Sequence, residues 1–384
     1  MNAAEKSASE LNASEPSAAE ISASELTASN GGASSHLPLH LPLHLPLHLP
    51  SHLQLHPPSQ APLLELRGLR TAFHTRQGAW PAVDGVDLLV HPGEIVGLVG
   101  ESGSGKSVTG FSIMRLIDPP GEIVAGEILF NGRDLLKIAE DDMRRLRGDR
   151  IAMIFQDPLM TLNPVLRISE QMLEAIQTHH PEVPRDEALA RCQQTLEMVG
   201  IADAAARLHN YPHAFSGGMR QRVAIAIAML NQPDLLIADE PTTALDVTIQ
   251  GQILYRMQEL CRLHGTAMIW ITHDLGVVAE LADRIAVMYA GRIVESGPTG
   301  EVIDAPRHPY TQGLLRSMPG NRAPGKRLYQ INGMAPNLTT RPIGCAFSPR
   351  CERAQPQCVA QDPAQTIEGT RSHRCHFPIQ QGDA

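Results

Sequence analysis

A glycine-rich segment, Gly100-Glu-Ser-Gly-Ser-Gly-Lys-Ser107, constrains the fold of this chain more than any other feature. It fits the pattern G-x-x-x-x-G-K-[ST] at every position. The apolar run 95–99 before it predicts a buried strand, and the segment 107–116 after it has a helical pattern. Glycines let backbone N–H groups turn inward around an anion, and a helix N-terminus adds a favourable dipole. The segment therefore predicts a loop that binds nucleotide phosphates through Gly100, Glu101, Ser102, Gly103, Ser104, Gly105, Lys106 and Ser107.

Two side chains of this loop have distinct predicted roles. Lys106 is expected to bridge the β- and γ-phosphates of ATP. The Ser107 hydroxyl is expected to ligate Mg²⁺, since the hydroxyl that ends this pattern does so in phosphate loops generally. A glycine-rich turn with a chance Lys-Ser is the competing interpretation, and the strand and helix on either side argue against it.

A second apolar run, 235–239, ends in two adjacent carboxylates, Asp239 and Glu240. Strand ends of this kind face the nucleotide in doubly wound sheets. We therefore expect Asp239 to hold Mg²⁺, through water, and Glu240 to polarise the attacking water as a general base. An acidic pair after a strand is often only a solvated loop, but the upstream phosphate loop favours the catalytic interpretation.

Short apolar runs alternate with longer helical patterns from Glu94 to about Pro298. Near-continuous apolar strands separated by helices indicate an α/β domain with a largely parallel sheet. From residue 301 onward proline, glycine and cysteine become frequent and periodicity is weak, which predicts a small C-terminal domain. The runs that predict buried strands are 95–99, 150–155, 235–239 and 267–271.

Residues 1–61 differ in composition from the rest of the chain. Alanine, serine and glutamate recur first, and a His-Leu-Pro-Leu repeat follows. Proline at every fourth position forbids a regular helix, so we expect a disordered, partly polyproline-like tail. Metal binding by its histidines is the alternative to a tolerated low-complexity extension; they are His36, His40, His44, His48, His52 and His56.

Bulk properties narrow the classes of protein. The 384 residues carry a formal net charge of −9, with a pI of about 6.0, which argues against a nucleic-acid binder. No apolar run reaches the roughly 18 residues of a membrane-spanning helix, and no secretory signal is visible. The expectation is a soluble cytoplasmic chain, in which clustered cysteines indicate metal binding or catalysis before disulfides.

Four of the six cysteines lie close together in the helix-poor C-terminal segment. Thiolates favour Zn²⁺ or an iron–sulfur cluster, so this group predicts a metal site, with free thiols in a loose tail as the alternative. Their spacing does not decide between the metals. Cys192 and Cys261 stand alone in helical patterns and are expected to be buried apolar residues. The clustered four are Cys345, Cys351, Cys358 and Cys375.

A further motif, Phe215-Ser-Gly-Gly-Met-Arg-Gln-Arg-Val223, precedes the acidic strand, and its serine and glycines open a helix whose free N–H groups suit an anion. The order of these motifs resembles the nucleotide-binding domain of ATP-binding cassette (ABC) transporters, over about Leu64 to Pro298. The resemblance implies a P-loop NTPase fold over 62–300, with a parallel-sheet core, an antiparallel β subdomain and a helical subdomain at about 157–230.

The same resemblance implies roles for single residues. Gln156 matches the Q-loop glutamine, which contacts Mg²⁺ and the attacking water. Asp246 matches the D-loop aspartate, and His273 the switch histidine that contacts the γ-phosphate. Gly100–Ser107 match the Walker A loop. The signature motif corresponds to Ser216, Gly217 and Gly218, the Walker B aspartate to Asp239 and the catalytic glutamate to Glu240.

Two positions fit the family pattern less simply. An aromatic that stacks on adenine is expected early in the domain; Phe73 fits best by position and Trp80 second. Met219 stands where the commonest signature has glutamine, although the serine and glycines that would touch phosphate are intact.

Two C-terminal segments, 305–311 and 341–351, resemble the extension of ATPase subunits from oligopeptide, dipeptide and nickel importers. The resemblance covers Glu301 to Cys375, within a predicted domain at 301–384. Some members of that family carry a 4Fe-4S cluster on these cysteines, which favours iron–sulfur over zinc. His373 and His376 flank Cys375 as substitute ligands.

The resemblance implies an ATP-hydrolysing subunit of an importer for peptides, peripheral on the cytoplasmic face of the inner membrane. Its expected partners are a second ABC ATPase, by resemblance a paralogue, two transmembrane permease subunits and, indirectly, an extracytoplasmic substrate-binding protein. Nucleic acid is not expected. The cargo stays open among dipeptides, oligopeptides, nickel and glutathione-like molecules.

Two other functions compete. A non-transport ABC ATPase acting on DNA or ribosomes would have a long coiled coil between its motifs or two cassettes, and this chain has neither sustained heptads nor a second phosphate loop. A small-molecule kinase with the same loop does not explain the signature segment or His273.

Overall fold

The computed structural model describes residues 61–76, 78–157, 161–242, 247–318, 329–336 and 341–380. The predicted N-terminal tail at 1–61 therefore lies outside the described residues, apart from Ala61. The D-loop residue Asp246 also lies outside them. The described residues all belong to one compact unit.

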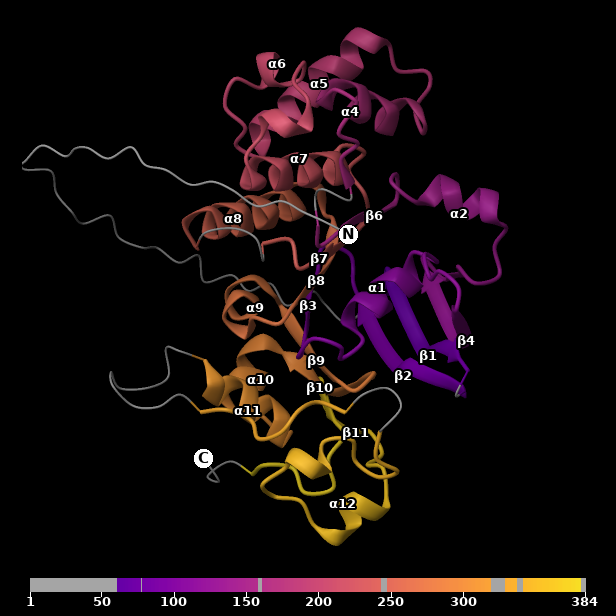
Figure 1. Ribbon diagram of the computed structural model, residues 1–384, viewed down its shortest axis with the longest axis vertical. Helices are drawn as coiled ribbons and strands as arrows, with labels where there is room; N and C mark the ends of the chain where they lie inside the picture. Colours follow the sequence, from indigo (N-terminus) through magenta and orange to yellow (C-terminus); the bar gives the residue numbers. More distant parts are fainter. Residues whose placement is uncertain are drawn as a thin grey trace, which may run out of the picture. The chain divides into compact units, whose positions relative to one another are not determined.

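An eight-stranded sheet forms the centre of the fold, in the order β11-β12-β10-β9-β3-β8-β7-β6 (Figure 1). The five strands from β9 to β6 are parallel. All residues of β3, β6, β7 and β8 are buried, which explains their near-continuous apolar sequences. The structure confirms the four predicted strands, and β9 completes the parallel set: β3 (Ile95–Val99), β6 (Ile151–Ile154), β7 (Leu235–Asp239), β8 (Ala267–Thr272) and β9 (Arg284–Tyr289).

A second, antiparallel sheet has the order β2-β1-β4-β5. Its long strands alternate buried and exposed residues, as expected for a sheet with one face in the core. Helix α1 (Lys106–Ile113) contacts β1, β2 and β7, and it confirms the helix predicted after the glycine-rich loop. The strands are β1 (Leu64–Thr75), β2 (Gly78–Val90), β4 (Gly121–Phe130) and β5 (Arg133–Asp134).

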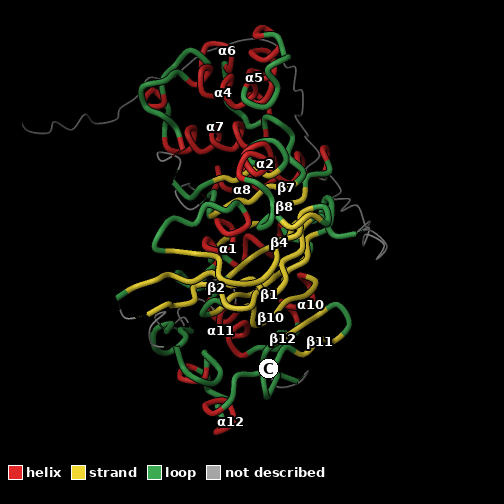
Figure 2. Tube along the Cα trace, turned by 90° about the vertical axis from the view of Figure 1, so that its right-hand side faces the viewer, coloured by secondary structure: helices red, strands yellow, loops and turns green. Residues whose placement is uncertain are grey.

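Most helices between β6 and β7 gather in one region, which Figures 1 and 2 both show on one side of the sheets. Cys192 is fully buried there and Cys261 is buried in α8, as predicted for both. The helices of this part are α4 (Ile168–Gln177), α5 (Arg185–Met198), α6 (Ala204–Arg207), the 3-10 turn η1 (Pro212–Ala214) and α7 (Gly217–Met229). Elsewhere lie α2 (Glu140–Leu146), α8 (Val247–His264) and α9 (Leu275–Leu281).

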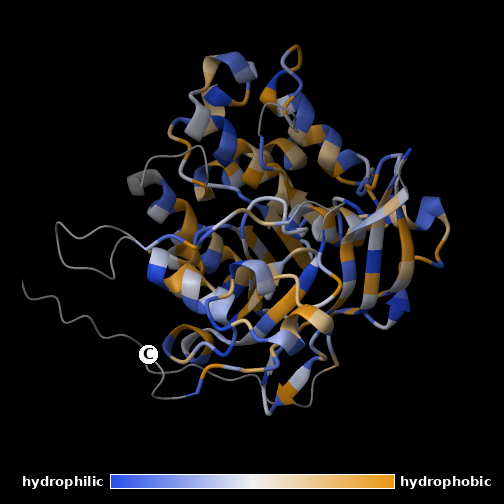
Figure 3. Cartoon of the chain, turned by 60° about the horizontal axis from the view of Figure 1, so that its bottom comes forward, coloured by the Kyte–Doolittle hydropathy of each residue, from blue (hydrophilic) through white to orange (hydrophobic). Residues whose placement is uncertain are grey.

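The C-terminal segment packs onto the central sheet. Strand β12 pairs with β10, with Glu295 opposite His373, and Phe347 is buried in the core that surrounds the parallel strands. Figure 3 shows apolar segments on both strands and helices. The elements are β10 (Arg292–Pro298), α10 (Thr299–Asp304), α11 (Pro309–Ser317), η4 (Ser348–Arg350), α12 (Pro356–Ala360), β11 (Thr366–Glu368) and β12 (Arg371–His373).

Among the described residues, no helix is both long and apolar enough to cross a bilayer.

Gly97 in β3 packs closely against Val278 in α9, and this contact can be tested by substitution. A Cβ at Gly97 would overlap Cγ1 of Val278, which is fully buried. We expect Gly97→Ala to lower the free energy of unfolding by about 1–3 kcal/mol, because it overpacks a rigid core. Chemical denaturation measures this. Adding Val278→Ala should restore part of the loss, whereas the exposed Gly251→Ala in α8 should not destabilise; a neutral Gly97→Ala would contradict the packing.

Candidate active site

The phosphate loop joins the end of β3 to the start of α1. Gly103 and Gly105 have φ values of 78° and 104°, in the region that favours glycine. A Cβ at Gly105 would also overlap the carbonyl oxygen of Ala82. The loop backbone thus follows a path that residues with a side chain could not adopt, and it leaves the N–H groups at the start of α1 available to an anion.

Lys106 has its ammonium group inside this loop. Its Nζ donates hydrogen bonds to the carbonyl oxygens of Gly100, at 2.8 Å, and Glu101, at 3.0 Å. Burial lowers the pKa of Lys106, and the nearby carboxylates of Glu240 and Asp239 oppose that shift. A buried cation at the centre of a ring of backbone groups is suited to bind phosphate oxygens.

Ser107 and Asp239, the two residues predicted to bind the same Mg²⁺ ion, lie next to each other. The Ser107 hydroxyl donates to Oδ1 of Asp239 at 3.0 Å, and Asp239 is almost fully buried at the end of β7. Burial raises the pKa of Asp239, and the hydrogen bond from Ser107 opposes this. Two oxygen donors at a phosphate loop match the ligand preference of Mg²⁺, so the residues present fit that ion.

Three more predicted residues meet beside this pair. Gln156 donates from Nε2 to one carboxylate oxygen of Glu240 at 3.2 Å, and Nδ1 of His273 lies 3.2 Å from the other. These residues follow β6, β7 and β8, which are neighbours in the parallel sheet, so their side chains emerge at one edge. Glu240 also has a positive φ of 45°, which is uncommon for a residue with a side chain and occurs often at functional sites.

The two aromatic candidates for adenine stacking are cross-strand neighbours. Phe73 in β1 pairs in register with Trp80 in β2, so both rings lie on the same face of the antiparallel sheet. Each is partly exposed, and the Trp80 indole N–H donates to the Thr75 hydroxyl. The structure does not favour Phe73 over Trp80.

The signature residues are found elsewhere, at the N-terminus of α7. The Ser216 hydroxyl caps this helix by accepting from the Met219 N–H at 3.3 Å. Ser216 and Gly217 are exposed, and α7 belongs to the helical region rather than to the sheet edge that carries Glu240. Gly218 follows them in the first turn. An exposed helix start without acidic residues in its first turn is a favourable anion site.

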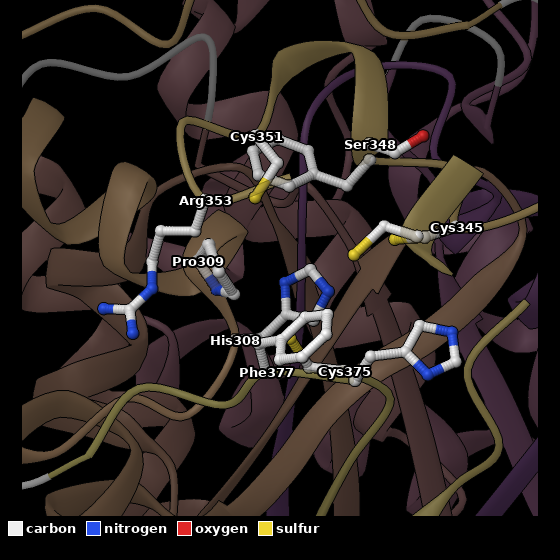
Figure 4. A pocket seen from close by; sticks show the side chains of 11 residues that line it. His308, Pro309, Cys345, Ser348, Cys351, Arg353, Cys375 and Phe377 are labelled. Atoms are coloured by element: carbon white, nitrogen blue, oxygen red, sulfur yellow. The ribbon is translucent and has the colours of Figure 1, made fainter. Parts of the chain in front are cut away.

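The four clustered cysteines line one pocket, together with His308, Phe347 and His376. Figure 4 shows Cys345, Cys351 and Cys375 around it. Burial raises the pKa of these three thiols, so they favour the protonated form. Within the described part of the chain, however, no group of three or more His, Cys, Asp and Glu side chains is arranged so that it could hold a metal ion.

Sequence reasoning missed two residues that contact the phosphate loop. Arg350 forms a salt bridge with Glu101, and the Tyr310 hydroxyl accepts a hydrogen bond from the Glu101 N–H at 2.9 Å. Arg350 is 249 residues from Glu101, and no local pattern marks either contact. The resemblance of segments 305–311 and 341–351 to importer extensions, and the cysteine cluster, pointed to this part of the chain but not to these two residues.

Comparisons with known proteins identify the family of the chain. The family model described as "ABC transporter" matches residues 83–243, and the model "Oligopeptide/dipeptide transporter, C-terminal region" matches residues 294–358. A peptide import ATP-binding protein from Brucella melitensis biotype 1 is 52% identical over 330 residues, covering 83% of this chain and 97% of the relative. A protein of the same name from Brucella abortus (strain 2308) is 49% identical over 315 residues, covering 82% and 95%.

Solved structures show the same cassette. A dimeric ATP-binding cassette in a post-hydrolysis state, bound to ADP and Pi, has a TM-score of 0.57 and 26% identity, and the match covers 62% of this chain and 98% of that one. A component of an ABC transporter complex from Clostridium perfringens has a TM-score of 0.54 and 26% identity, with 64% and 92% covered. The chain therefore belongs to the ABC transporter family. Within that family it is an ATP-binding subunit and an ATPase.

The contacts of Glu240 lead to a direct test of its role. Replacing Glu240 with Gln keeps the shape of the side chain, but it turns one acceptor oxygen into an NH2 donor and removes the group expected to accept a proton from water. We expect Glu240→Gln to bind ATP normally and to lose hydrolysis by about 100-fold or more, measured as phosphate release. The exposed carboxylate Glu259 in α8 provides a matched control, Glu259→Gln, that should hydrolyse ATP at the wild-type rate. Retained turnover in Glu240→Gln would rule out the assignment.

Proposed function

We propose that this chain is the ATP-hydrolysing subunit of an ABC importer for peptides. The cluster of Lys106, Ser107, Asp239 and Glu240 around the phosphate loop is the observation that carries the proposal. The names of the relatives, peptide import ATP-binding proteins, support the cargo class. The match of residues 294–358 to the C-terminal region of oligopeptide and dipeptide transporters supports the same class from a second part of the chain.

In the proposed mechanism, the phosphate loop and Lys106 bind the triphosphate. Ser107 and Asp239 would hold Mg²⁺, which would supply positive charge to neutralise the phosphates. The Glu240 carboxylate accepts a proton from the attacking water. His273 and Gln156 keep this carboxylate oriented, since each contacts a different one of its oxygens. Phe73, or Trp80 beside it, stacks on the adenine.

The proposed ATP site is shared between two subunits. Ser216, Gly217 and Gly218 start α7, in the helical region, so the helix that would complete the anion site comes from a second cassette. The dimeric state of a matched cassette supports this arrangement. Asp246, which lies outside the described residues, is proposed as the D-loop aspartate. By resemblance the second subunit is a paralogue of this chain.

The remaining proposed partners follow from the importer class. Two transmembrane permease subunits supply the pathway, and an extracytoplasmic binding protein delivers cargo to them. The chain would then sit peripherally on the cytoplasmic face of the inner membrane. Closure of the two cassettes on ATP, and opening after hydrolysis, would move the permeases.

Reconstitution tests the proposed transport function. We expect proteoliposomes that contain this chain, a partner ATPase and two permease subunits to accumulate a labelled peptide mixture when ATP and a binding protein are supplied. The same vesicles with Glu240→Gln should accumulate none, because closure without hydrolysis gives no cycle. ATP hydrolysis without uptake of any peptide, together with co-purification of ribosomes or DNA, would favour the non-transport alternative.

We also propose that Cys345, Cys351, Cys358 and Cys375 hold a 4Fe-4S cluster, with Zn²⁺ as the alternative metal. Their position around one pocket supports a shared ligand set, and four thiolates are the usual ligands of both. Binding would require the sulfurs to draw closer than they lie in the described residues, with loss of the thiol protons. His373 and His376 are the substitute donors.

Metal analysis of the full chain tests this site. Protein purified without oxygen should be brown and contain about four iron atoms per chain if the cluster forms. Cys345→Ala and Cys375→Ala should each lose the colour. The matched control is Cys192→Ala, which removes a buried thiol that does not line the pocket and should keep the colour. Colourless protein with one zinc per chain would reject iron–sulfur, and protein without either metal would reject the site.

A further inference from the structure

We propose that Arg350, in the C-terminal extension, is a positioning residue for the phosphate loop. It holds the loop through Glu101 and cancels the negative charge that Glu101 brings to the ATP site. The inference rests on the proposed role of residues 100–107 in binding the triphosphate. The C-terminal extension would then contribute to nucleotide binding, in addition to the metal proposed at its four cysteines.

Arg350 and Glu101 form a bidentate salt bridge. Nη1 donates to Oε2 of Glu101 at 2.8 Å, and Nη2 donates to Oε1 at 3.0 Å. The Arg350 side chain is only 7% exposed and that of Glu101 is 28% exposed, so solvent screens this pair less than a surface ion pair. A fork of this kind fixes the direction of the carboxylate as well as its distance.

Arg350 is itself held rigidly. Its Nε donates to the Asn332 carbonyl oxygen at 2.9 Å, and Nη1 also lies 3.3 Å from the Tyr289 hydroxyl. The guanidinium stacks over the rings of Tyr289 and Phe347. These partners come from β9, which is in the central sheet, and from the extension. These contacts fix the position of the Arg350 guanidinium. Through Glu101, Arg350 therefore positions the phosphate loop relative to the central sheet.

The backbone of Glu101 is tethered on the same side. Its N–H donates to the Tyr310 hydroxyl at 2.9 Å, and Tyr310 belongs to α11 of the extension. Its carbonyl oxygen accepts from Nζ of Lys106 at 3.0 Å and from the N–H of Ser104 at 3.2 Å. A shift of Glu101 would thus move the atoms that orient Lys106, which is the cation expected to bind phosphate.

Charge gives a second reason for the pair. Glu101 is an acidic residue in a loop that is proposed to bind a polyanion, and its carboxylate opposes the effect of burial, which lowers the pKa of Lys106. Without Arg350 this carboxylate would repel the phosphates. Arg350 supplies the compensating charge, so the extension makes an acidic residue acceptable at this position.

A double-mutant cycle tests the inference. The affinity of the full chain for a fluorescent, non-hydrolysable ATP analogue with Mg²⁺ is measured in Arg350→Ala, Glu101→Gln and the double variant. We expect Arg350→Ala to weaken binding by about tenfold, because it both frees the loop and exposes a carboxylate. The double variant should bind more tightly than Arg350→Ala, since the repelling charge is gone. Independent effects that simply add would overturn the proposal, as would wild-type affinity in Arg350→Ala.

Further variants separate loop positioning from general damage. Arg316→Ala is the matched control, because Arg316 also stacks on a tyrosine of the extension, Tyr329, but is exposed on α11. It should bind the analogue like the wild type. Arg350→Lys keeps the charge and loses the fork, so it should bind with intermediate affinity. If Arg350→Ala does not fold, wild-type affinity in Arg350→Lys overturns the positioning role.

Lys106→Ala distinguishes failure of this inference from failure of the proposed function. If Lys106→Ala abolishes binding of the analogue while Arg350→Ala leaves it unchanged, residues 100–107 bind ATP and only the role of Arg350 is wrong. If Lys106→Ala binds the analogue like the wild type, the loop is not the phosphate site, and the proposed function fails with it.

Discussion

The parallel ladder of β6, β7, β8 and β3 is the constraint on which the active site depends. Parallel strands bring their carboxyl ends to one edge of a sheet, about 4.8 Å apart from neighbour to neighbour. Gln156, Glu240 and His273 each follow one of these strands, and the phosphate loop follows the fourth. A slip in the register of β7 would separate the carboxylate of Glu240 from both Gln156 and His273.

Two ionisable groups at this edge, Lys106 and Asp239, have pKa values shifted by burial. Burial lowers the pKa of Lys106 and raises that of Asp239, so each group is shifted toward its neutral form. A cation bound at Asp239 and a polyanion bound at Lys106 would each oppose the corresponding pKa shift. The two groups therefore suit a metal–nucleotide complex, which carries both charges.

Much of this arrangement could be predicted from local sequence. The four buried strands are short apolar runs, and the glycine-rich loop has its own pattern, so both needed only neighbouring residues. The contact between Arg350 and Glu101 could not be predicted, because it joins residues 249 positions apart and depends on how the extension folds back. Strand β12 could not be predicted, because Arg371, Ser372 and His373 lack the alternation of apolar and polar residues that indicates a strand. The choice between Phe73 and Trp80 stays open because the two rings are neighbours.

The way in which the extension joins the sheet affects the solubility of the whole cassette. Strand β10 contains apolar residues, and without β12 its outer row of N–H and C=O groups would be an open template for other chains. The extension ends this row with β11, a three-residue strand whose side chains are exposed. Short edge strands of this kind discourage pairing between molecules. A cassette cut after β10 would thus expose a strand edge with unpaired backbone groups. The extension therefore disfavours self-association as well as contacting the phosphate loop.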